Sequence, residues 1–96
     1  MSKHGYVYIV TNAPYGTLYI GVTSNLPIRI YQHKNELAKG FTERYDLKQL
    51  VYFEQLEHMG AAIVREKQLK AWRRQWKLEL VSKSNPGWDD LYEQIL

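Results

Sequence analysis

Residues 6–11 and 17–23 read Tyr6-Val7-Tyr8-Ile9-Val10-Thr11 and Thr17-Leu18-Tyr19-Ile20-Gly21-Val22-Thr23, and these two stretches decide the fold. Both are rich in β-branched and aromatic side chains, which favour strands. The segment between them, Asn12-Ala13-Pro14-Tyr15-Gly16, contains the residue types that form turns. The pattern therefore predicts a β-hairpin near the start of the chain.

The rest of the chain predicts helices and one further strand. A helix is expected after Ser24-Asn25, because asparagine caps helix N-termini, Pro27 suits the first turn and Gly40 ends the run. The later elements are a strand over Leu50–Phe53, one long helix from Gly60 to about Val81, a break over Ser82–Gly87 and a short helix over Trp88–Leu96. This order predicts an α+β fold, a small three-stranded antiparallel sheet flanked by helices.

Length and composition narrow the class of protein. A chain of 96 residues predicts one domain, residues 1–96, and 45% apolar with 24% charged residues is typical of a globular protein. The absence of cysteine excludes disulfides and cysteine-ligated zinc. The sequence contains neither a membrane-spanning apolar run nor the apolar stretch of a signal peptide, so a cytoplasmic location is expected. A net charge of +3 favours anionic partners only mildly.

Strand geometry brings two tyrosines within reach of each other. Alternate residues of a strand point to the same face, so Tyr6 shares a side with Tyr8, and Tyr19 shares one with Gly21. Gly21 leaves open space beside the tyrosines, because it has no side chain. Tyrosine also suits strands for packing alone, so this pair does not by itself establish a site.

The helix expected after Asn25 carries two polar residues on its inward side. At about 100° per residue, His33 lies within about 20° of Leu26 and about 40° of Leu37. Arg29 precedes His33 by four residues and lies beside it. An inward histidine alone is more often a core residue than a catalyst. Because burying an unpaired charge is costly, Arg29 is expected either to pair with a glutamate or to receive an anion.

The long helix places a carboxylate among its apolar residues. Glu66 lies within about 60° of Leu69, on the stripe that also contains Ala62 and Trp76. A carboxylate that faces a sheet requires a cation, which is either Arg29 or a divalent metal ion, and the pattern does not decide between them.

A second face of the same helix is basic. It carries Lys67, Lys70, Arg74 and Lys77. Such a run is commonly a solvated surface, but it also suits contact with the phosphates of a nucleic acid.

The inward polar set fits hydrolysis of a phosphodiester better than acyl transfer. Its members are Tyr8, Tyr19, Arg29, His33 and Glu66. The sequence has no serine–histidine–aspartate set and no glycine-rich phosphate-binding loop.

The order of these residues resembles the GIY-YIG nuclease family over nearly the whole chain. The resemblance rests on Tyr6-Val7-Tyr8, Tyr19-Ile20-Gly21, Arg29 with His33, Glu66, and Asn85 before Pro86. The chain is similar to small stand-alone bacterial members, which are related to the N-terminal nuclease domain of the excision-repair C subunit. It departs from the family at Tyr6, where the motif begins with glycine, and around Thr42, where a histidine or another polar residue is common.

The resemblance implies a metal-dependent endonuclease that hydrolyses DNA, with DNA repair as its context. Glu66 would hold one Mg²⁺ or Mn²⁺, and Arg29 would stabilise the phosphoryl oxygens. Tyr8 would take the proton from the attacking water, with cationic neighbours favouring its phenolate. The supporting roles would belong to Tyr19, which hydrogen-bonds nearby, His33, which assists proton transfer, and Asn85, which positions the Glu66 region or a phosphate.

Binding of the DNA would fall to the basic face of the long helix. A protein partner or a second copy of the chain would then supply specificity. Two alternatives remain open on the sequence: a non-catalytic nucleic-acid-binding module on the same scaffold, and a purely structural domain in which Glu66 is salt-bridged.

Overall fold

The computed structural model describes residues 4–35 and 45–96. Its elements, in chain order, are the strands and helices β1 (Gly5–Thr11), β2 (Leu18–Thr23), α1 (Leu26–Lys34), β3 (Gln49–Leu56), α3 (Met59–Ala71), α4 (Arg74–Ser84) and the 3₁₀ helix η1 (Tyr92–Ile95). The expected α+β class is confirmed. Within the described ranges, no helix is both long and apolar enough to span a membrane.

The predicted hairpin forms two strands, β1 and β2, of a three-stranded antiparallel sheet. The strand order is β2-β1-β3, so β1 is paired on both sides. Tyr8 lies opposite Gly21 of β2 and Phe53 of β3. Since residues opposite each other in a ladder share a face, the ring of Tyr8 and the vacant side of Gly21 point the same way.

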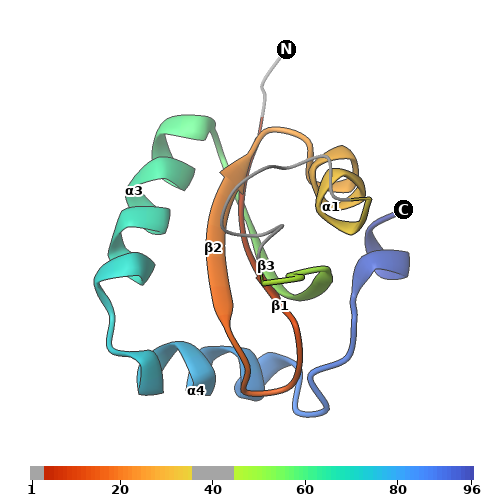
Figure 1. Cartoon of the computed structure of the whole chain (residues 1–96). Coiled ribbons are helices and arrows are strands. Elements are labelled where there is room, and N and C mark those ends of the chain that lie inside the picture. Colours follow the sequence, from red (N-terminus) through yellow and green to blue (C-terminus); the bar gives the residue numbers. More distant parts are fainter. Residues whose placement is uncertain (1–3, 36–44) are drawn as a thin grey trace.

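Helices cover both faces of this sheet (Figure 1). On the α3 side the core contains Val7, Ile9, Ile20, Val51, Ala62, Leu69, Val81 and Trp88. On the α1 side it contains Tyr8, Val10, Leu26, Ile30, Leu47 and Leu50, against which the C-terminal segment also packs. The start of α1 is as predicted, because Asn25 Oδ1 accepts the N–H of Ile28 and a proline occupies the first turn. The expected continuation to Leu37 and Gly40, and the position of Thr42, lie outside the described residues.

The prediction of one long helix from Gly60 to Val81 is wrong. The backbone is extended at Trp72 and Arg73, with ψ of 151° and 149°, and a separate helix, α4, begins at Arg74. A straight helix of that length would be about 33 Å long, whereas an eight-residue strand such as β3 spans about 26 Å. After the break, α4 packs against the rest of the protein, and its Val81 is buried in the core.

This break also changes the environment of one residue on the expected apolar stripe. Ala62 and Leu69 are buried as predicted, whereas Trp76 is 46% exposed. The indole of Trp76 instead contacts Trp72 edge-on and lies under the guanidinium of Arg73.

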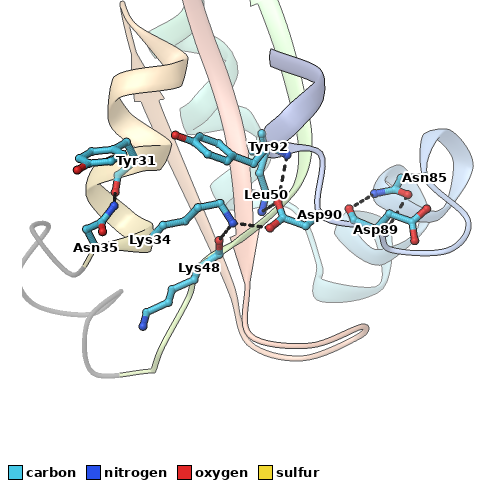
Figure 2. A network of polar contacts seen from close by, with 9 residues as sticks. All are labelled: Tyr31, Lys34, Asn35, Lys48, Leu50, Asn85, Asp89, Asp90 and Tyr92. Atoms are coloured by element: carbon cyan, nitrogen blue, oxygen red, sulfur yellow. Dashed lines mark hydrogen bonds and ion pairs between the residues drawn. The ribbon is translucent and has the colours of Figure 1, made fainter. Parts of the chain in front are cut away.

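The expected helix over Trp88–Leu96 is reduced to η1. Two of its backbone N–H groups bond outside a regular helix: Leu91 N–H donates to Leu50 O at 2.7 Å, and Tyr92 N–H donates to the carboxylate of Asp90. The same carboxylate accepts the N–H of Leu50. Figure 2 shows the contacts of Asp90 with Leu50 and Tyr92, together with Lys34 of α1, which donates to both Asp90 and the carbonyl of Lys48. The C-terminal segment is therefore tied to β3 and α1 by polar contacts.

Candidate active site

Tyr8 lies at the centre of the candidate site because Gly21 gives its ring room. Tyr8 is fully buried on β1. A Cβ on Gly21 would lie 2.4 Å from both Cζ and the hydroxyl oxygen of Tyr8, far inside van der Waals contact. The glycine is thus required by the ring that passes over it, and the ring is fixed against the edge strand β2.

Gly21→Ala is expected to destabilise the protein by about 1–3 kcal/mol, because the buried Tyr8 ring must shift. Denaturant unfolding measures this cost. In a Tyr8→Leu background the ring is absent, and the same Gly21→Ala change should then cost less than about 1 kcal/mol. An equal cost in both backgrounds would contradict the proposed packing.

Two side chains of α1 contact the hydroxyl oxygen of Tyr8. Arg29 Nε donates to it at 3.2 Å, and His33 Nε2 lies 2.9 Å away. Arg29 and His33 are four residues apart, so one helical face presents both to the same atom. His33 is 4% exposed, which agrees with its predicted inward position.

Burial controls the charge of this cluster. Burial raises the pKa of the Tyr8 phenol, and the hydrogen bond and charge of Arg29 only partly oppose this rise. Burial, with the nearby charge of Arg29, lowers the pKa of His33 to about 4. At neutral pH, Tyr8 is therefore protonated and His33 is neutral. Arg29 by itself therefore does not favour the phenolate that the reaction is expected to need, because desolvation outweighs this one cation.

These charge states give each hydrogen bond a direction. The Tyr8 hydroxyl donates to Nε2 of neutral His33 while its oxygen accepts from Arg29 Nε. His33 Nδ1 has no hydrogen-bond partner within residues 4–35 and 45–96. A continuous path for a proton thus runs from the Tyr8 oxygen to the His33 ring.

Arg29 keeps part of its guanidinium available. Nε is bonded to Tyr8 and Nη1 donates to Gln32 Oε1 at 3.1 Å. Nη2 makes no hydrogen bond with the described part of the chain, and Arg29 is only half-buried. Of the two outcomes expected for Arg29, the pairing with Glu66 is not formed in the described part of the chain, because Glu66 pairs with Lys70.

Tyr19, Glu66 and Lys70 complete the cluster from β2 and α3. The Tyr19 ring lies 5.9 Å from that of His33, and Lys70 Nζ lies 5.9 Å from the Tyr19 ring centre. Lys70 Nζ is 3.3 Å from Glu66 Oε2, so the cation beside Glu66 comes from its own helix. Glu66 is therefore linked to the cluster through Lys70, which lies beside both its carboxylate and the Tyr19 ring.

Four of the predicted site residues, Tyr8, Tyr19, Arg29 and His33, therefore lie together, and Glu66 adjoins them through Lys70. The side chain of Asn85 lies elsewhere: its amide group donates to the carbonyls of Val51 and Asp89, and its oxygen accepts the N–H of Asp89. These contacts use Asn85 to hold the C-terminal segment on β3.

The basic residues of α3 and α4 are in different surroundings. Lys67 is exposed, whereas Arg74 donates to the carbonyls of Tyr15 and Gly16 and so fastens the hairpin turn to α4. Lys70 and Lys77 line a shallow groove of about 330 Å³ along β2, with Leu18, Tyr19 and Ile20. The predicted single basic face is thus divided by the helix break, and its Lys70–Lys77 part adjoins the site.

Glu66 fits a magnesium-type ligand set and not a zinc-type one. Within the described ranges, no three or more His, Cys, Asp or Glu side chains gather in a way that could hold a metal ion. Mg²⁺ is commonly bound through one or two carboxylates, with water and substrate phosphate completing its shell. A single half-buried glutamate is compatible with that chemistry.

Sequence reasoning missed two supporting contacts. Gln32 accepts from Arg29, and its spacing of three residues on α1 is a helical-neighbour signal that could have found it. The contact of Lys34 with Asp90 joins residues 56 positions apart, and no local pattern indicates it. Tyr6, at the glycine position of the motif, packs against the α1-side core.

Comparison with known proteins identifies the nuclease-type family to which this fold belongs. A family model for the GIY-YIG catalytic domain matches residues 4–79, so the chain belongs to the GIY-YIG family. A UPF0213 protein of Staphylococcus saprophyticus is 37% identical over 83 residues, which cover 86% of this chain and 99% of that protein. A UPF0213 protein of Clostridium perfringens is 38% identical over 80 residues, covering 83% and 85%.

A third relative is similar over most of its length. A UPF0213 protein of Haloquadratum walsbyi is 31% identical over 83 residues, covering 86% of this chain and 92% of that protein. Comparison with solved structures gave no significant match. The family supports a nuclease-type function with DNA as the partner, and the relatives' names specify no activity.

Proposed function

We propose that this protein is a metal-dependent endonuclease that hydrolyses DNA phosphodiester bonds at the β2 edge of its sheet. The observation that carries the proposal is the contact of Tyr8 with both Arg29 and His33, to which Glu66 is linked through Lys70 and Tyr19. A proton acceptor, an anion-binding cation and a carboxylate are the groups that phosphodiester hydrolysis requires. They converge here from three separate elements of the fold.

In the proposed mechanism, Tyr8 acts as the general base through a relay. Its oxygen takes a proton from the attacking water as its own proton passes to Nε2 of His33. The low pKa of His33, about 4, keeps that nitrogen free of a proton before the reaction. Because Arg29 disfavours the resulting imidazolium, His33 returns this proton to the Tyr8 oxygen once hydrolysis is complete, as the proton taken from water leaves that oxygen for solvent.

Arg29 and Glu66 would stabilise the charge that develops on the phosphate group during hydrolysis. The Nη2 group of Arg29 would donate to a phosphoryl oxygen as negative charge develops there. Glu66 would hold one Mg²⁺ or Mn²⁺, and this ion, when bound, supplies Lewis-acid stabilisation of the leaving 3′ oxygen. The 3′ oxygen leaves phosphorus as the water oxygen bonds to it, and it then takes a proton from solvent. Tyr19 would help to orient the relay.

Access to Tyr8 requires a local movement, since Tyr8 is fully buried in this state. Arg29 is half-buried and the Lys70 side chain is 51% exposed, so these are the parts of the site best able to move when DNA enters. Lys67, Lys70 and Lys77 would contact DNA phosphates, as would Arg74 if it leaves the hairpin turn. Asn85 would act by holding the C-terminal segment in place.

Metal removal tests the proposal. Supercoiled plasmid incubated with the protein and Mg²⁺ is expected to be nicked or linearised, and excess EDTA should stop the reaction. Salt-dependent DNA binding, measured in parallel, separates the alternatives. DNA binding without strand scission over long incubation would favour the non-catalytic module, and no binding at low salt would favour a purely structural domain.

A further inference from the structure

The ion pair between Lys70 and Glu66 is weak and can exchange for other partners. Its ammonium pairs with Glu66, the residue proposed to hold the metal ion, at 3.3 Å. The Lys70 side chain is 51% exposed, whereas that of Glu66 is only 15% exposed. Ion pairs with one partner so exposed contribute little and exchange readily. The carboxylate is therefore fixed in place, and its cation is the movable partner.

The same lysine also lines a groove that suits a phosphate. Lys70 and Lys77 border the groove along β2, and its other lining residues are Leu18, Tyr19 and Ile20. Lys77 Nζ donates to the carbonyl of Lys70 at 3.4 Å, which brings the two basic side chains to the same stretch of the surface. No carboxylate belongs to this lining among the residues that the structure describes. Two ammonium groups beside aliphatic and aromatic surface fit an anionic phosphodiester.

We infer that Lys70 exchanges Glu66 for a DNA phosphate in this groove when a divalent cation binds to Glu66. The inference rests on the proposed function and adds a coupling to it. The ammonium of Lys70 and the metal ion compete for one carboxylate, so each weakens the binding of the other. A phosphate in the groove withdraws Lys70 from this competition. Metal and DNA therefore strengthen each other's binding, and by linkage the coupling is equal in both directions.

Metal binding to the free protein gives the first test. Lys70→Gln removes the competing ammonium and is expected to tighten Mn²⁺ binding about two- to fivefold, as measured by the loss of the free Mn²⁺ electron paramagnetic resonance signal. Lys83→Gln removes the same charge from an exposed position in the last turn of α4 and controls for net charge. Equal Mn²⁺ affinity in Lys70→Gln and the parent overturns the inference.

DNA binding gives the second test, in a Tyr8→Phe background that prevents cleavage. Lys70→Gln should weaken binding of a fluorescent duplex more with Mg²⁺ than without it, again by about two- to fivefold, because only the metal-bound protein has Lys70 available. An equal loss in both conditions overturns the inference.

The outcome for Glu66→Gln separates this inference from the proposed function. If Glu66→Gln leaves Mn²⁺ binding unchanged, both fail. If Mn²⁺ binding depends on Glu66 and not on Lys70, the inference alone fails.

Discussion

Glu66→Gln is expected to reduce Mg²⁺-dependent DNA cleavage by roughly 10³-fold or more, since several kcal/mol of transition-state stabilisation depend on the metal ion that Glu66 would hold. The fold should survive. Glu66 is partly buried, but its ion pair is with the exposed Lys70, so its loss should change the free energy of unfolding by less than about 1 kcal/mol. Initial rates of plasmid nicking and a denaturant melt measure the two quantities.

Glu57→Gln is the matched control for this variant. Glu57 is an exposed glutamate in the turn between β3 and α3, and the change removes the same charge. It should cut DNA at the parental rate. Parental cleavage by Glu66→Gln, with its fold intact, would exclude Glu66 as the metal-binding residue.

Arg29→Ala is expected to reduce cleavage by about 10²–10³-fold, the loss typical of one donor to a developing oxyanion. Arg29 also donates to the Tyr8 oxygen and opposes the burial-induced rise in the pKa of Tyr8. Without Arg29 the relay therefore begins from a phenol that is harder to deprotonate. The effect should appear in the rate at saturating DNA as well as in binding, because Arg29 acts on the reacting phosphate.

Two further variants show whether charge or geometry matters at this position. Arg29→Lys keeps a positive charge but loses the fork that reaches both Tyr8 and Gln32, so it should recover only part of the lost rate. Arg73→Ala removes an exposed arginine that stacks on Trp76, away from the cluster, and should cut normally. Normal cutting by Arg29→Ala would refute its proposed role.

Local patterns predicted much of this architecture. The alternation of side chains along each strand predicted the hairpin, in which Tyr8 and Gly21 share a face. Helical periodicity placed His33 and Arg29 on the inward side of α1, where both contact Tyr8. These features depend on spacing within one element or on the register of one hairpin, and the sequence records such information directly.

The features that the sequence did not predict depend on tertiary fit. No proline or glycine marks the break, at which the backbone is extended at Trp72 and Arg73 before α4 begins. The cation beside Glu66 could not be chosen from helical angles alone, and the structure identifies it as Lys70. The protonated state of Tyr8 likewise follows from complete burial, which outweighs the neighbouring Arg29.

Diffraction from a crystal soaked in Mn²⁺ is the most direct test of the central claim, that Tyr8, Arg29 and Glu66 form one metal-dependent site. Anomalous scattering locates the ion without any assumption about its ligands. The account predicts a peak at the carboxylate of Glu66, on the side that faces Tyr8 and Arg29, with Lys70 displaced from its ion pair. A crystal in which Mn²⁺ binds only elsewhere, with the contact of Lys70 and Glu66 intact, would contradict it.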